Sequence, residues 1–165
     1  MALACEPDVL IADEPTTALD VTIQAQILEL MQELQKKLGM AIILVTHDLG
    51  VIADMCDEII VMYGGRVCER GNAEDIFYNP KHEYTKGLLR SIPSIKNAKE
   101  KLVPIDGTPI NLLNMPKGCA FSSRCDSAMK ICLTEMPEEI RLGDTHLASC
   151  WVNVKEIMKD GGAKE

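Results

Sequence analysis

The sequence predicts an α/β fold whose first half alternates strands with a helix and whose second half is rich in loops. Two short apolar runs, at residues 9–12 and 40–45, enclose an amphipathic stretch. Strand, helix and strand in succession favour a parallel sheet, because a crossover helix returns the chain for a second parallel strand. The 165 residues are 47% apolar and 25% charged, as in a globular chain, and 4% aromatic, which indicates an aliphatic core.

Residues 9–12 are predicted to be a buried strand because this apolar run is bounded by prolines and carboxylates. A helix is predicted between Asp20, a favourable N-cap, and Gly39, a favourable residue just past a helix end. Residues 40–45 form the second predicted strand. The apolar residues of the helix lie on one stripe: Ile23, Ile27, Leu30, Met31, Leu34 and Leu38.

The remainder of the chain is predicted to contain a hairpin, two short helices and a long loop. Gly64 and Gly65 separate two strand-like runs, as in a tight antiparallel turn. Short helices are expected at residues 73–77 and 84–89, and prolines predict an extended loop over most of residues 91–118. Since the pattern changes after residue 71, we predict two domains, residues 1–75 and residues 76–165.

Charge and hydropathy argue against two classes of function. The net charge is −8; residues 1–75 hold 14 acidic and 4 basic residues, whereas residues 76–165 hold 11 and 13. An acidic first half argues against a nucleic-acid binder, which needs a basic surface. The longest apolar run has six residues and no secretory signal opens the sequence. We therefore expect any membrane association to pass through a partner, since a spanning helix needs ~20 apolar residues.

Charged side chains follow both predicted strands of the first domain. Asp13 and Glu14 come directly after the first strand, and His47 follows the second. Because parallel strands end at the same edge of a sheet, these groups are expected to reach one ligand. A carboxylate there can hold Mg²⁺, the next can activate water, and a histidine can donate to a terminal phosphate. On its own, a strand ending in two carboxylates is more often a solvated turn.

Residues 9–20, VLIADEPTTALD, resemble the Walker B motif and D-loop of ABC transporter ATPases, and residues 45–48, VTHD, resemble their switch-histidine segment. The resemblance implies part of a P-loop NTPase fold, with a RecA-like parallel sheet, that uses ATP and Mg²⁺. It implies that Asp13 supports Mg²⁺, that Glu14 is the catalytic base and that His47 contacts the γ-phosphate. It also implies that Asp20 acts across the interface with a second ATPase subunit.

Three other motifs of that family do not occur in these 165 residues: the G-x-x-x-x-G-K-[ST] phosphate loop, the glutamine loop and the Leu-Ser-Gly-Gly signature. The backbone amides and lysine of the phosphate loop supply most of the grip on ATP. We therefore expect the sequence to correspond to the C-terminal half of an ATPase subunit. We also expect it to hydrolyse ATP negligibly by itself.

Four of the seven cysteines form a candidate metal site near the end of the chain. The odd number of cysteines favours free thiols in a reducing compartment over a disulfide framework. The spacing C-x5-C-x6-C-x17-C fits zinc fingers poorly and iron–sulfur ligands better, and four unligated thiols are the remaining alternative. His146 is interpreted either as a hydrogen-bond donor to a ligand of this site or as an ordinary surface histidine. The candidate ligands are Cys119, Cys125, Cys132 and Cys150, while Cys5, Cys56 and Cys68 are interpreted as core or surface thiols.

Residues 82–93, HEYTKGLLRSIP, and the cysteine-rich segment from Gly118 to Trp151 resemble the region after the ATPase core in oligopeptide and dipeptide transporter ATPases. In that subfamily four cysteines are associated with a [4Fe–4S] cluster, so the resemblance implies such a cluster here, with zinc as the alternative. It implies an ATP-binding subunit that couples ATP hydrolysis to peptide uptake, on the cytoplasmic, inner face of the cell membrane. The implied partners are transmembrane permease subunits and a second ATPase subunit, without nucleic acid. The alternative function is a non-enzymatic iron–sulfur or zinc module.

Overall fold

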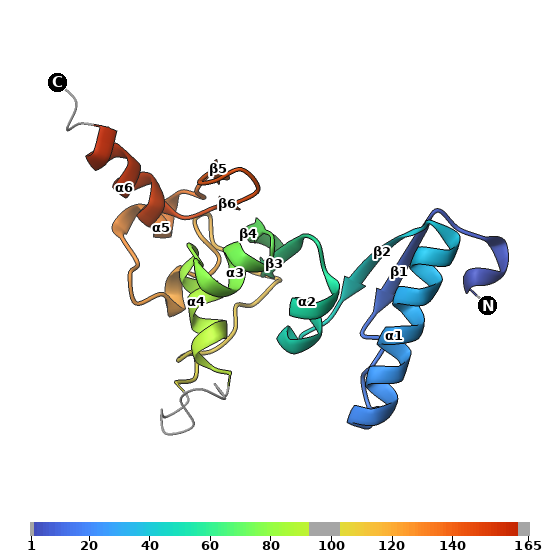
Figure 1. The fold of residues 1–165 in the computed structure, drawn as a ribbon. Helices are drawn as coiled ribbons and strands as arrows, with labels where there is room; N and C mark the ends of the chain where they lie inside the picture. Colours follow the sequence, from blue (N-terminus) through green and yellow to red (C-terminus); the bar gives the residue numbers. More distant parts are fainter. Residues whose placement is uncertain (1, 93–102, 162–165) are drawn as a thin grey trace. The chain divides into compact units, whose positions relative to one another are not determined.

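A computed structural model describes residues 2–92 and 103–161, which form a mixed α/β fold (Figure 1). The chain divides into two compact units, Met1–Met55 and Cys56–Glu165. This division falls 20 residues before the predicted change of domain at residue 75. It separates the strand–helix–strand unit from the hairpin, because the hairpin belongs to the sheet of the second unit.

The first unit contains a two-stranded parallel sheet and two α-helices. Its elements, in chain order, are η1 (Ala2–Cys5), β1 (Val9–Asp13), α1 (Val21–Leu38), β2 (Ala41–Val45) and α2 (Leu49–Met55). Strands β1 and β2 pair from Val9 opposite Ala41 to Asp13 opposite Val45, so both end at the same edge. The predicted strand–helix–strand order and its parallel pairing are thus confirmed.

Local signals define α1 as the sequence predicts. The side chain of Asp20 accepts a hydrogen bond from the amide of Ile23 and caps the N-terminus. At the other end Gly39 takes a left-handed conformation, with φ of 68°, and its amide donates to the carbonyl of Gln35. A residue with a Cβ adopts this conformation at a cost, which explains a glycine at this position.

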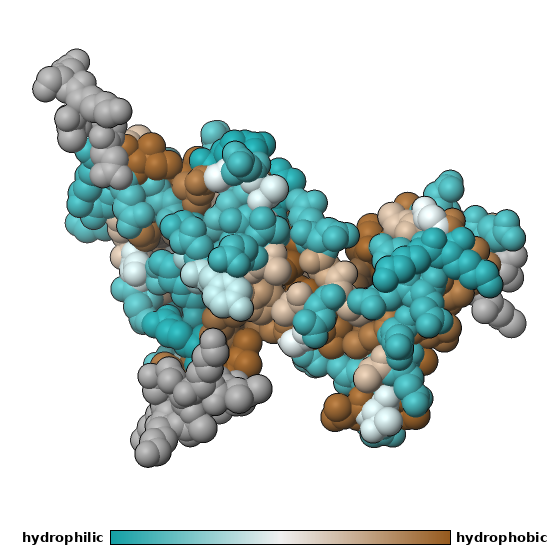
Figure 2. All heavy atoms as spheres, in the orientation of Figure 1, coloured by the Kyte–Doolittle hydropathy of each residue, from teal (hydrophilic) through white to brown (hydrophobic). Residues whose placement is uncertain are grey.

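One face of the β1–β2 sheet is exposed in this unit. Val9, Ile11, Ile43 and Val45 are 48–67% exposed, whereas the alternating residues on the opposite face are half-buried. Figure 2 shows hydrophobic surface over this part of the chain. Only Met31, Met40 and Val51 of the described residues in this unit are buried apolar side chains.

The second unit contains a four-stranded antiparallel sheet in the order β3–β4–β6–β5. Gly64 and Gly65, both with positive φ, form the predicted turn between β3 and β4. The two predicted short helices are confirmed as α3 and α4. The elements are β3 (Ile59–Tyr63), β4 (Arg66–Gly71), α3 (Ala73–Tyr78), α4 (Glu83–Arg90), η2 (Ser122–Arg124), α5 (Lys130–Thr134), β5 (Ile140–Arg141), β6 (Leu147–Ala148) and α6 (Trp151–Gly161).

An aromatic cluster forms the core of the second unit, so the aliphatic core that the composition predicts is wrong for this unit. The ring of Tyr63 lies 4.7 Å from that of Tyr84 and 5.3 Å from that of Phe121, measured between centroids. Cys68 and Ala120 complete the buried cluster. The predicted long loop is confirmed for residues 103–118, which contain no helix or strand, while residues 93–102 lie outside the described residues. Its side chains Ile105, Ile110 and Met115 pack on the cluster.

In residues 2–92 and 103–161, no helix has the length and apolar character that crossing a membrane requires.

Candidate functional site

The predicted carboxylates and histidine lie at the carboxyl end of the parallel sheet. Asp13 is the last residue of β1 and pairs with Val45, the last residue of β2. The amide of Glu14 donates to the carbonyl of Val45 over 2.8 Å, which extends the pairing one residue beyond the strands. His47 follows two residues after Val45, so the topology alone brings its side chain to Glu14.

Both carboxylate oxygens of Glu14 have a partner. Nδ1 of His47 lies 3.0 Å from Oε1, and the hydroxyl of Thr17 donates to Oε2 over 2.8 Å. These hydrogen bonds, that of Thr17 foremost, hold the pKa of the Glu14 carboxyl below its ordinary value. The group is therefore ionised at neutral pH, although it is exposed to solvent. An ionised carboxylate that is oriented by two neighbours is suited to accept a proton from water.

The backbone at Glu14 is strained. Its φ is 45°, in the left-handed region that residues with a Cβ rarely adopt, and Ala18 in the same turn has φ of 65°. Such strain costs of order 1–3 kcal/mol for each residue and concentrates at functional sites. Here it turns the chain sharply after β1, so that Thr17 reaches back to the Glu14 side chain.

Asp48 fixes the turn that carries His47. This role of Asp48 is not predicted from the sequence. Its Oδ2 accepts from the side-chain amide of Gln24 on α1 over 3.0 Å, and its Oδ1 accepts from the amide of Gly50 at the start of α2. The hydrogen bond from Gln24 is the largest cause of the lowered pKa of Asp48. An aspartate directly before a helix was the available sequence signal.

Asp13 and Asp20 do not join this hydrogen-bonded group. Asp20 uses its carboxylate to cap α1, and among the described residues no hydrogen bond or ion pair links either aspartate to Glu14 or His47. Asp13 is nevertheless exposed at the same sheet edge as Glu14. The described residues therefore bring Glu14 and His47 together and leave the two aspartates open to solvent.

The four candidate cysteine ligands line one small pocket in the second unit. The amide of Cys119 donates to the carbonyl of Cys132 over 2.8 Å, and the sulfur of Cys132 accepts from the amide of Met129. Half of the other pocket residues come from the starts of α4 and α6. The full lining is His82, Glu83, Cys119, Phe121, Ser122, Cys125, Ser127, Cys132, Pro137, Cys150, Trp151 and Val152.

The thiols of this pocket are free and are not arranged around a metal ion. Within residues 2–92 and 103–161, no group of three or more His, Cys, Asp or Glu side chains is arranged to hold one. The structure therefore gives no support to the predicted iron–sulfur cluster beyond the shared pocket. Burial raises the pKa of Cys119, Cys125 and Cys150, that of Cys125 to about 11, so these thiols are protonated.

The remaining cysteines agree with their interpretation as core or surface thiols. Cys68 is buried in the aromatic core, and burial raises its pKa to about 12. Cys5 is exposed and Cys56 is half-buried.

His146 is not the surface histidine that one interpretation of the sequence describes. It is 2% exposed, and its Nε2 lies 2.7 Å from Oε1 of the fully buried Glu69. Its Nδ1 lies 3.5 Å from Oδ1 of Asp75. The sequence around His146 is polar and gives no sign of burial, because the burial depends on a strand and a helix some 70 residues away.

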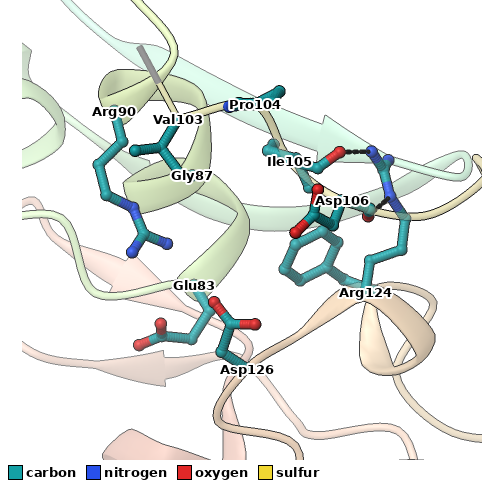
Figure 3. Close-up of a pocket in the computed structure, with 10 residues that line it drawn as sticks. Glu83, Gly87, Arg90, Val103, Pro104, Ile105, Asp106, Arg124 and Asp126 are labelled. Carbon is teal, nitrogen blue, oxygen red and sulfur yellow. Dashed lines mark hydrogen bonds between the residues drawn. The ribbon is translucent and has the colours of Figure 1, made fainter. Parts of the chain in front are cut away.

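A second pocket of this unit lies between α4, the loop from Val103 to Asp106 and the turn after η2 (Figure 3). Arg124 donates from Nη2 to the carbonyl of Ile105 over 2.8 Å and from Nε to the carbonyl of Asp106 over 2.9 Å. Its guanidinium thus fastens the loop to η2. Glu83 lines this pocket and the cysteine pocket alike.

Comparisons with known proteins identify similar sequences along the whole chain. A sequence model of the family described as oligopeptide/dipeptide transporter, C-terminal region, matches residues 68–132. The dipeptide transport ATP-binding protein DppD of Bacillus subtilis is 51% identical over 168 aligned residues, which cover 100% of this chain and 50% of DppD. The oligopeptide transport ATP-binding protein OppD of the same organism is 54% identical over 92% of this chain and 43% of its own length.

The chain thus spans about half the length of the curated relatives it matches. Among solved structures, CbiO1 of Clostridium perfringens, described as part of the ABC transporter complex CbiONQ, is 44% identical. That alignment covers 45% of this chain and 30% of CbiO1, with a TM-score of 0.42.

Proposed function

Because the chain belongs to the oligopeptide/dipeptide transporter family of ATP-binding proteins, we propose that it supplies the water-activating part of a peptide importer's ATPase. The observation that carries this proposal is the Glu14–His47 pair at the end of two parallel strands. In this proposal, β1 and β2 are strands of a RecA-like sheet in a P-loop NTPase domain that includes residues 1–75. Residues 76–165 are the extension typical of peptide transporters.

Each residue of the site has a distinct proposed role. Glu14 accepts a proton from the attacking water, and its ionised, doubly hydrogen-bonded carboxylate suits that task. His47, whose side chain is 79% exposed, donates to the γ-phosphate of ATP. Asp13 supports Mg²⁺, which neutralises phosphate charge when bound. Asp20 contacts the second ATPase subunit from its place at the start of α1.

Turnover in this proposal needs a phosphate-binding loop, which the 165 residues do not include. The proposed partners are transmembrane permease subunits and a second ATPase subunit, and the proposed location is the cytoplasmic face of the cell membrane. ATP hydrolysis would then drive the uptake of short peptides. The names of the relatives, which describe dipeptide and oligopeptide transport, support this over a free-standing metal-binding module.

The four cysteines are the proposed ligands of a [4Fe–4S] cluster, with zinc as the alternative metal. Their donor set fits either, since four thiolates bind both, and all four line one pocket. Binding would require the buried thiols to lose their protons and their sulfurs to draw together, because they do not surround a metal position as they stand. Such a metal would cross-link residues 119–150, a segment whose helices and strands have two to five residues each.

ATP turnover by the assembled transporter that contains this chain tests the catalytic proposal. Glu14→Gln is expected to abolish turnover because an amide cannot take a proton from water. Glu29→Gln, at an exposed position on α1, is the matched control and is expected to leave turnover unchanged. Full activity of the Glu14→Gln transporter would contradict the proposal.

Metal analysis of the chain prepared without oxygen tests the cluster. About four irons per chain are expected, and replacing any one of the four cysteines with Ser is expected to lower the iron content. Cys5→Ser, at an exposed position, is the control. Stoichiometric zinc without iron would support the alternative, and protein free of both metals would contradict a metal site.

A further inference from the structure

Two carboxylates and an imidazole are buried together beside the cysteine pocket. Glu69 on β4 is completely buried, and Asp75 on α3 keeps only 20% of its side chain exposed. His146 lies between them, with Nε2 2.7 Å from Glu69 and Nδ1 3.5 Å from Asp75. The contact to Glu69 is a hydrogen bond, whereas the contact to Asp75 is longer, so His146 is joined most closely to Glu69.

Glu69 has every donor that a buried carboxylate needs. Besides His146, the amides of Lys81 and His82 donate to its two oxygens over 2.7 and 2.9 Å. A buried carboxylate without hydrogen bonds is costly, so these three donors account for the tolerance of Glu69 inside the unit. Asp75 is also satisfied, because the hydroxyl of Thr145 donates to it over 2.7 Å.

The donors to Glu69 come from two chain segments that contribute to the lining of the cysteine pocket or lead into it. Lys81 and His82 directly precede α4, and the His82 side chain lines the pocket. His146 directly precedes β6, which pairs with β4 and leads within two residues to Cys150. One carboxylate on β4 therefore holds both segments at once.

We propose that Glu69, through its hydrogen bonds with His146 and with the amides of Lys81 and His82, is a positioning residue that keeps His82 and Cys150 at the four-cysteine pocket. The proposal rests on the proposed metal site, because holding Cys150 in place would serve metal binding. The hydrogen bonds that hold the two segments, however, are present in the metal-free chain. Glu69 touches no metal in this proposal and acts only through the segments it holds. Its loss displaces Cys150 from the other three cysteines.

The hydrogen bond from His146 to Glu69 can be observed in the unaltered full chain by nitrogen-15 NMR. Nε2 is expected to carry a proton that exchanges slowly, because the ring is buried against Glu69. A ring without a proton on Nε2 would overturn the proposal, since Glu69 would then lack its donor on the segment that leads to Cys150. This measurement does not depend on whether any variant folds or whether any metal binds.

Cobalt(II) is the probe for the position of Cys150, because its thiolate charge-transfer absorption grows with the number of bound sulfurs. Wild type is expected to show four thiolates, whereas Glu69→Gln is expected to show three and at least tenfold weaker binding. His146→Gln keeps a side-chain donor and is expected to weaken binding less. Glu58→Gln, with a side chain 62% exposed in the same unit, is the control. Four thiolates with unchanged affinity in Glu69→Gln would overturn the proposal.

Amide hydrogen exchange separates this proposal from the proposed metal site. If the wild-type chain binds no cobalt, the proposed metal site is contradicted. Amide hydrogen exchange in the metal-free chain then tests whether Glu69 holds the two segments. Glu69→Gln is then expected to speed exchange at residues 81–84 and 146–150 together. Acceleration in only one of these segments, or in neither, would overturn the role of Glu69 as their common anchor.

Discussion

Replacement of Gly118 by Ala is expected to break the close approach of the two backbone segments that carry Cys119 and Cys132. A Cβ at Gly118 would lie 2.2 Å from the carbonyl oxygen of Cys132 and 2.7 Å from the carbonyl carbon of Leu133. Both neighbours are backbone atoms, so no side chain can turn aside. Restoring even a 3.0 Å contact requires the segments to separate by roughly 0.8 Å.

That separation also removes a hydrogen bond. The amide of Cys119 lies 2.8 Å from the carbonyl of Cys132, and an increase of about 0.8 Å takes it beyond hydrogen-bonding distance. The lost bond costs about 0.5–1.5 kcal/mol and the overpacking about 1–3 kcal/mol. We therefore expect Gly118→Ala to lower the free energy of unfolding of the second unit by about 2–4 kcal/mol.

Urea unfolding monitored by tryptophan fluorescence measures this change, because Trp151 is the only tryptophan and lines the cysteine pocket. Gly65→Asn is the matched control. Nothing lies within 4 Å of a Cβ at Gly65, and asparagine tolerates its positive φ. A Gly118→Ala protein that unfolds within 0.5 kcal/mol of wild type, as the control is expected to do, would refute the close backbone approach.

Three further predictions concern single side chains. Thr17→Val is expected to raise the pKa of the Glu14 carboxyl in an NMR titration, while Thr17→Ser keeps it low; equal values in both variants would exclude the hydroxyl as the cause. Burial lowers the pKa of His82 to about 4. Between about pH 6.5 and pH 4, the unfolded chain therefore binds a proton at this histidine and the folded chain does not. The second unit should therefore lose about 3 kcal/mol between pH 6.5 and 4, and His82→Asn should abolish this dependence in urea titrations. Ile11, 67% exposed on the bare sheet face, should promote self-association, which Ile11→Lys should reduce in sedimentation experiments; a monomeric wild-type chain would contradict this.

The sequence predicts the structure best where the determining interactions are local or follow from topology. Asp20 and Gly39 bound α1 because a cap depends on residues within one helical turn. Glu14 and His47 are far apart in sequence, yet their meeting follows from the parallel order of the strands they end. The hairpin at Gly64 and Gly65 is likewise a local feature.

Interactions between segments that lie far apart in the sequence are not predicted by local patterns. Strands β5 and β6 have two residues each and exist only because β6 pairs with β4. His146 is buried by the same pairing, so its polar neighbours in sequence give no sign of it. The clustering of Cys119, Cys125, Cys132 and Cys150 in the sequence marks them as candidate ligands, and the four share a pocket, but their spacing does not show which metal they would bind.

The cysteine pocket and the Glu14–His47 pair differ in how many buried side chains surround them among the described residues. The Cys119–Cys150 pocket rests on a unit with its own buried core, including Phe121, Ile76 and Ala148. The Glu14–His47 pair rests on two strands with an exposed apolar face and few buried side chains around them. Burial of that face by further polypeptide would stabilise the sheet by about 25 cal/mol for each Å² covered. The geometry of the catalytic pair is therefore expected to depend on such a partner, whereas that of the cysteine pocket is not.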